Sequence, residues 1–227
     1  MGTDDLFRRR KEERTTRKSR ALELRNARWL IVCEGEETEV NYFESLINYA
    51  NSKSNKKINH TVKGLGMNTD SLVKSVDNLI RKTETYVKDS MVSFEKIFVV
   101  FDKDSFSASN FNEAINRCHR LGYIPLWSNE CFELWYILHF EYLTSGIGRQ
   151  IYFDKLSRLM GKKYSKSDKH FELIGTVKKI PTAYRNATKL LERHSNDKNK
   201  SYSKMVPCTT VHKIIDELEQ SLDIELK

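Results

Sequence analysis

Two clusters of acidic residues, each directly after a short apolar run, constrain this chain most strongly. The apolar run Trp29–Cys33 is followed by Glu34–Glu39, which contains four glutamates, and the run Ile97–Phe101 is followed by Asp102-Lys103-Asp104. Short runs rich in Val and Ile are typical of buried parallel strands. Ligands of open α/β sheets bind beyond the carboxyl ends of such strands. The pattern therefore predicts an α/β fold with acidic side chains gathered at one edge of a sheet.

These carboxylates predict a site for a hard cation such as Mg²⁺ or Mn²⁺, which prefers oxygen ligands and suits phosphate chemistry. Asp102 and Asp104 alternate across the end of a strand with Lys103 between them, so both can face one cation. Glu34 either completes the ligand set or acts as a general base, and both roles stay open. Glu133, at the start of a predicted helix after the fourth strand, is a candidate for a further ligand or for a residue that orients one.

The apolar periodicity predicts four strands, at 28–33, 58–62, 96–101 and 123–127. It predicts helices after them at 38–50, capped by Thr38, and at 70–87, 110–121 and 132–140. This order predicts a mostly parallel four-stranded sheet flanked by helices. After Gly146 the pattern turns helical, with candidates at 151–160, 183–194 and 209–222. We therefore divide the chain into a basic arm (1–27), an α/β core (28–144) and a helical C-terminal lobe (145–227).

The net charge of +8 is distributed unevenly. Residues 1–28 contain ten Lys and Arg against five Asp and Glu, and residues 161–204 contain twelve against four, whereas the intervening segment is slightly acidic. This distribution would suit a protein whose two basic segments bind a polyanion and whose acidic middle segment binds a cation. It would equally suit exposed helices with solvated charges. Candidates for contact with the sugar-phosphate backbone are Arg8, Arg9, Arg10, Lys11, Lys162, Lys163, Lys166 and Lys169.

Other residue types favour packing over chemistry. The four cysteines lie far apart with no C-x-x-C, which predicts buried thiols in a reducing cytoplasm. His139 and the aromatic residues around it are expected in the core. The turn Gly64-Leu65-Gly66 lacks the third glycine of a dinucleotide fingerprint. With neither a signal peptide nor an apolar run long enough to span a membrane, the chain is expected to be cytoplasmic.

Four segments in order resemble the RloB-like family: Cys33–Phe43, Val100–Asp104, Ser128–Phe140 and Pro207–Val211. Together they span most of residues 28–222. The resemblance implies a Toprim-type core, as in topoisomerases, primases and OLD-type nucleases. Such cores hold Mg²⁺ with a glutamate after the first strand and a D-x-D after the third, which match Glu34, Asp102 and Asp104. For a second metal ion, the resemblance leaves Glu39, Glu36 and Glu37 as the candidate ligands.

The resemblance also implies a biological setting. RloB-like proteins are associated with prokaryotic defence and restriction loci, often beside an AAA-type ATPase, and related Toprim effectors cut nucleic acid, some of them tRNA. We therefore expect a metal-dependent nuclease acting on RNA in an anti-phage abortive system with an ATPase partner. Docking of that partner is expected on the basic arm or on an acidic C-terminal helix with Asp216, Glu217 and Glu219. A DNA endonuclease or nickase at the same site, and a non-catalytic nucleic-acid-binding subunit, are the alternatives.

Overall fold

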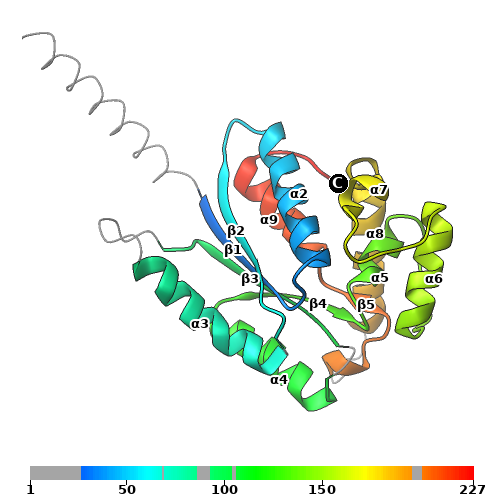
Figure 1. Ribbon diagram of the computed structural model, residues 1–227, viewed down its shortest axis with the longest axis horizontal. Helices are drawn as coiled ribbons and strands as arrows, with labels where there is room; N and C mark the ends of the chain where they lie inside the picture. Colours follow the sequence, from blue (N-terminus) through cyan, green and yellow to red (C-terminus); the bar gives the residue numbers. More distant parts are fainter. Residues whose placement is uncertain (1–26, 68, 86–92, 104–105, 196–200) are drawn as a thin grey trace, which may run out of the picture.

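The computed structural model describes residues 27–67, 69–85, 93–103, 106–195 and 201–227. Within these ranges the chain forms one sheet and eight α-helices, which are β1 (Ala27–Cys33), α2 (Thr38–Lys53), β2 (Ile58–Gly64), α3 (Thr69–Thr85), β3 (Lys96–Asp102), α4 (Ala108–Arg120), β4 (Ile124–Asn129), α5 (Glu133–Leu138), α6 (Arg149–Met160), α7 (His170–Leu173), α8 (Thr176–Ser195), β5 (Cys208–Thr209) and α9 (Lys213–Leu222) (Figure 1). The predicted basic residues Arg8, Arg9, Arg10 and Lys11, and also Asp104, lie outside the described residues.

The strands are arranged in the order β2-β1-β3-β4-β5. The first four strands are parallel, as predicted, and β5 pairs antiparallel to β4 through Ser128 opposite Thr209 and Asn129 opposite Cys208. The prediction of four strands was therefore wrong by one. A two-residue strand is too short to show a period-2 pattern, and its second residue, Thr209, falls in the predicted helix 209–222, which begins only at Lys213.

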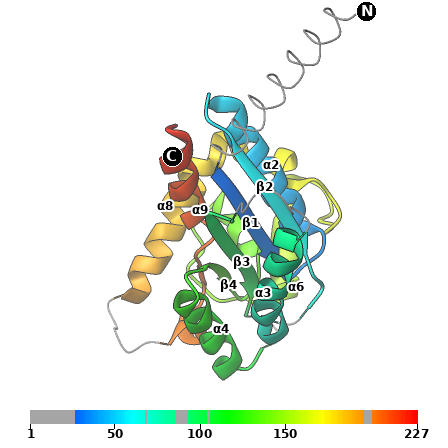
Figure 2. The ribbon, with the colours of Figure 1, turned by 90° about the vertical axis from the view of Figure 1, so that its left-hand side faces the viewer.

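Side chains of β1 show how the sheet separates two hydrophobic layers. Trp29, Ile31 and Cys33 belong to one buried cluster, whereas Leu30 and Val32 belong to the other, as the alternation of a strand requires. The helices α3 and α4 cover the second face, and α2 and α9 cover the first (Figure 2). Buried side chains of α5 also belong to the cluster on the first face.

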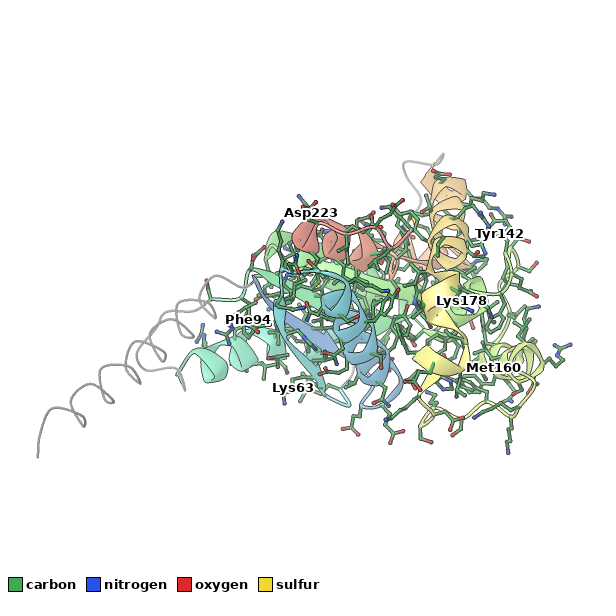
Figure 3. All side chains as sticks on the ribbon, turned by 90° about the horizontal axis from the view of Figure 1, so that it is seen from above. Lys63, Phe94, Tyr142, Met160, Lys178 and Asp223 are labelled. Atoms are coloured by element: carbon green, nitrogen blue, oxygen red, sulfur yellow. The ribbon has the colours of Figure 1, made fainter. Side chains whose placement is uncertain are left out.

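Residues on both sides of position 145 share the larger cluster, which joins Phe43 of α2 to Leu190 of α8 and Leu218 of α9. Figure 3 shows Tyr142, Met160 and Lys178 on the side of the molecule away from Phe94. The helices α6 to α8 therefore extend the α/β layer sideways, while β5 and α9 return to the sheet.

Several residues predicted to pack do so. The thiols of Cys33, Cys118, Cys131 and Cys208 are buried. His139 is 1% exposed, and burial lowers its pKa to about 4, so this imidazole is a neutral core residue. Its Nδ1 donates to the carbonyl oxygen of Trp135 at 2.8 Å. None of the helices in the described ranges has the length and apolar composition needed to cross a bilayer.

Thr38 does not cap α2. It is the first residue of the helix, after the cap position Glu37, and its hydroxyl donates to the carbonyl oxygen of Lys166 at 3.1 Å. The hydroxyl thus binds a segment 128 residues further along the chain, a contact that local sequence cannot predict.

Candidate functional site

The strand order places a topological switch point between β1 and β3. From β1 the chain crosses to β2 on one side of the sheet, whereas β3 lies on the other side. Crossovers that diverge in this way leave a crevice at the carboxyl ends of the two strands, where ligands of open α/β sheets bind. Glu34 directly follows β1, and Asp102 is the last residue of β3. The two acids predicted from the sequence are therefore at the switch point.

Backbone and side-chain hydrogen bonds tie Glu34 to β3. Its N–H donates to the carbonyl oxygen of Val100 at 2.9 Å, which continues the pairing of the two strands by one residue. Its carboxylate oxygen Oε2 accepts the backbone N–H of Asp102 at 3.2 Å. The side chain of Glu34 therefore lies across the strand ends, toward β3.

A pocket of about 390 Å³ opens at this edge of the sheet. The loop 34–39 forms part of its lining, and Gly66, Asp102, Phe132, Glu133, Arg149 and Lys166 form the rest. Glu39 lies in the first turn of α2 and Glu133 is the first residue of α5, and both side chains are buried. Six acidic and two basic side chains thus line the described pocket, a formal charge of −4 when all are ionised.

The crowding of acids changes their protonation. Burial raises the pKa of Asp102 well above its usual range, and the charges of Glu39, Glu133 and Glu34 raise it further. Burial also raises the pKa of Glu39, with a contribution from Glu133, while Lys166 and Arg149 act in the opposite direction. Carboxyls whose charged forms repel one another in a buried site gain from a bound cation or a shared proton.

Protein donors orient two of the carboxylates. The backbone N–H of Phe132 donates to Asp102 Oδ2 at 3.1 Å, and the buried hydroxyl of Tyr164 donates to Glu133 Oε1 at 2.8 Å. Each bond engages one oxygen of a group that accepts at two. The site therefore holds its carboxylates by named contacts, and Tyr164 is a supporting residue that sequence reasoning missed.

As a donor set, these carboxylates fit a hard divalent cation, which binds oxygen ligands and offsets excess negative charge. Among the described residues, however, no group of three acidic, histidine or cysteine side chains is arranged to hold a metal ion. Asp104, the second aspartate of the predicted ligand set, lies outside those residues. The chemistry of the pocket thus fits a metal, while the complete ligand arrangement stays a prediction.

Glycine allows the close approach of the acidic loop to its surroundings. A Cβ on Gly35 would lie within 2.9 Å of the Glu39 carboxyl carbon, and one on Gly64 would lie 2.5 Å from the Glu36 Cα. Gly66, which has φ of +57°, lies beside the Glu36 carboxylate and lines the pocket. The Gly64-Leu65-Gly66 turn therefore belongs to the site, although its sequence matched no phosphate-binding motif.

The predicted basic residues of the C-terminal half have different surroundings. Lys166 lines the pocket, whereas Lys162 forms an ion pair with Asp168 at 2.8 Å. Lys163 and Lys169 are exposed and are not among the described lining residues. Arg149 also lines the pocket, and sequence reasoning missed it because it is isolated from other basic residues in the sequence.

Comparison with known proteins shows the family to which this chain belongs. The model of one protein family, described as RloB-like protein, matches residues 29–218. No curated protein and no solved structure matches the chain. The matched range begins in β1, ends in α9 and includes Glu34, Glu39, Asp102 and Glu133. Because the match covers most of the chain, this protein belongs to the RloB-like family.

Proposed function

We propose that the pocket at the switch point is the catalytic centre of a metal-dependent phosphodiesterase, a nuclease of Toprim type. The observation that carries the proposal is the gathering of Glu34, Glu39, Asp102 and Glu133 around one pocket at the carboxyl ends of β1 and β3. The parallel order β2-β1-β3-β4, with the acids after the first and third strands, supports a Toprim-type core.

Electrostatics support a bound cation. Four excess negative charges in a partly buried pocket repel one another and would repel a phosphate group as well. Glu34, Asp102 and Asp104 would hold Mg²⁺ or Mn²⁺, with Glu39 and Glu133 available as further ligands. A divalent ion held by these residues would supply positive charge to offset that of the phosphate and would make an attacking oxygen more acidic.

The protein groups have separate tasks in this proposal. The N–H groups of Asp102 and Phe132 fix one oxygen each of Glu34 and Asp102, so neither carboxylate has to be ordered when a ligand arrives. Glu34 serves as a ligand or as the base that takes a proton from the attacking oxygen, within reach of the same edge of the sheet.

Charge and family support a proposal for the substrate class and the biological role. Basic segments on both sides of the acidic core suit a polyanion, and membership of the RloB-like family suits a defence locus. We propose RNA, including tRNA, as the substrate, abortive anti-phage defence as the role, and an AAA-type ATPase as the partner that controls activity.

The experiment is cleavage of labelled RNA and DNA by the full-length protein, alone and with its neighbouring ATPase, in Mg²⁺, Mn²⁺ or EDTA. Asp102→Asn should abolish cleavage, since it removes a charge from the proposed ligand set while keeping the size of the side chain. Asp154→Asn, the same change at an exposed residue of α6, should leave the rate unchanged. Cleavage that survives EDTA, or survives Asp102→Asn and Glu34→Gln, would reject a metal-dependent nuclease at this pocket.

A further inference from the structure

We infer that Arg149 and Lys166 form a phosphate-binding subsite in the wall of the pocket, which receives the sugar-phosphate backbone of the nucleic acid. The inference rests on the proposed function, and it concerns a pair of residues that are 17 positions apart in the sequence yet line the same pocket.

Both cations lie close to the same aromatic ring, that of Phe153. The Arg149 guanidinium carbon lies 5.9 Å from the centroid of the Phe153 ring, and the Lys166 ammonium nitrogen lies 5.8 Å from the same centroid. Phe153 is one turn after Arg149 in α6, which lies beside α5 in Figure 1. A cation near an aromatic face gains about 0.5–1 kcal/mol at exposed sites, which favours one orientation over free rotation.

The segment that carries Lys166 is fastened to the acidic side of the pocket. The Lys166 carbonyl oxygen accepts the hydroxyl of Thr38, and Tyr164 donates to Glu133. The rings of Tyr164 and Phe153 have their centroids 5.2 Å apart. Lys166 is therefore held beside the start of α2 and the start of α5, in a defined position relative to Glu39 and Glu133.

Two roles are open to cations placed in this way. They could serve only to balance Glu39, whose charged form they favour. Two positive charges do not balance six acids, however, so the remaining negative charge calls for bound cations or protons as well. Once bound cations and protons have neutralised the carboxylates, the guanidinium and the ammonium are the described lining groups that can donate charged hydrogen bonds to a phosphate, with Arg suited to two oxygens and Lys to one.

The ligand is identified by this chemistry as a phosphodiester group, without a preference for base sequence. Exposed lysines and arginines elsewhere on the lobe add long-range attraction but do not line the pocket. Arg158 on α6 and Lys53, the last residue of α2, provide the comparison, since they are exposed, carry the same charges and are not among the described lining residues.

The test compares two double variants, Arg149→Gln with Lys166→Gln and Arg158→Gln with Lys53→Gln. Both lower the net charge by two. Affinity for labelled single-stranded RNA and DNA is measured by fluorescence anisotropy in Ca²⁺, over a salt series, with the probe checked for cleavage on a gel. We expect the pocket variant to lose about 10-fold or more in affinity and to flatten the slope of log K against log salt by about 1.4, the value for two single-strand phosphate contacts. The control should change affinity less than 3-fold.

Each outcome has a meaning for the subsite. An equal loss of affinity in the two variants would show that only the overall charge attracts nucleic acid, and this result would overturn the subsite. Unchanged affinity in the pocket variant, or no binding by the wild-type protein, would also overturn it. Binding that depends on Arg149 and Lys166 without any cleavage would keep the subsite and reject the nuclease. If the wild type cleaves nucleic acid and the pocket variant binds it as tightly as the wild type does, the proposed nuclease activity stands and the subsite is rejected. Parallel arms with RNA and DNA show which backbone is preferred.

Discussion

The backbone N–H of Asp102 donates to the carboxylate of Glu34, joining the last residue of β3 to the residue that follows β1. The contact places two negative side chains side by side at the crevice of the sheet, where Glu39 and Glu133 add to the repulsion. A protein that keeps such a cluster carries an electrostatic penalty in its ligand-free state. The first two predictions measure that penalty.

Replacing the Asp102 carboxylate with an amide should stabilise the ligand-free protein at neutral pH. Because the pKa of Asp102 is raised by folding, the folded state keeps its proton to a higher pH than the unfolded chain does. Between those two pKa values stability falls as pH rises, starting near the unfolded value of about 3.9. In EDTA, thermal unfolding of the wild type should therefore show a melting temperature that declines above that pH, and Asp102→Asn should show a weaker decline. A steeper decline in the variant would contradict the buried, repelled carboxylate.

Divalent ions should reverse the same penalty. At 100 times its dissociation constant, a ligand that binds only the folded state adds about 2.7 kcal/mol, which for a chain of this size raises the melting temperature by about 5–10 °C. Mg²⁺ or Mn²⁺ should produce such a shift in the wild type and a much smaller one in Glu34→Gln and in Asp102→Asn. Asp154→Asn is the control, and a shift of equal size in all four proteins would place the ion elsewhere.

Tyr164 should contribute to the site through Glu133. Tyr164→Phe removes the donor to a buried carboxylate, and a buried acceptor left without its donor costs about 1–3 kcal/mol of folding stability. The same change at Tyr152 is the control, since that side chain is buried in α6 and its hydroxyl donates to no carboxylate among the described residues. Chemical denaturation should therefore separate the two variants, and metal affinity should fall in Tyr164→Phe alone. Equal effects would show that both hydroxyls serve only packing.

Gly35 should matter because of the side chain that lies over it. A methyl group there meets the carboxylate of Glu39, a flexible group that can move, so Gly35→Ala should fold with a stability change within about 1 kcal/mol and bind metal more weakly. If the loss acts through Glu39, it should disappear when Glu39→Ala is already present. This double-mutant cycle, measured by metal-induced thermal shift, should give a coupling of the size of the single effect. Additive losses would mean that Gly35 acts on the loop itself.

The strands and the acidic strand ends could be predicted because their signals are local. Apolar runs of β1 and β3 and the acids after them are contiguous in the sequence, and the parallel order follows from alternating strands and helices. Even so, the burial of Asp102 was unexpected for a residue at a strand end, since it depends on Phe132 of the next connection. An alanine at this position would therefore disturb a hydrogen-bonded interior group, which is why the isosteric asparagine is the sharper variant.

Contacts between distant segments explain what sequence reasoning missed. Arg149 reaches the pocket and Tyr164 reaches Glu133 from the region after α5. Lys166 was predicted as a contact to the sugar-phosphate backbone, but its place in the pocket wall depends on Thr38, which is 128 residues away in the sequence. Nothing in a single sequence shows that two residues so far apart along the chain are in contact. The fifth strand was missed for the same reason, because its two residues form a strand only by pairing with the distant strand β4.

The last prediction concerns the acidic helix α9, which was expected to offer a docking surface for a partner. Its acids are engaged within the chain: Asp216 accepts the hydroxyl of Tyr184 at 2.8 Å, Glu217 pairs with Lys96, and Glu219 accepts the backbone N–H of Leu226 at 2.7 Å. On its other face α9 buries Ile214, Ile215, Leu218 and Leu222. This helix is thus part of the folded core.

Deleting residues 209–227 should therefore unfold the protein. Burying each of the four aliphatic side chains of α9 contributes about 1.5–3 kcal/mol, and their sum approaches the entire stability of a typical domain, about 5–15 kcal/mol. The truncated chain should lack a cooperative thermal transition, and any loss of ATPase binding would then reflect unfolding. Asp223→Asn, at a highly exposed carboxylate just after α9, should melt as the wild type does. A truncated chain that melts cooperatively near the wild-type temperature would show that α9 is dispensable and return it to consideration as a docking element.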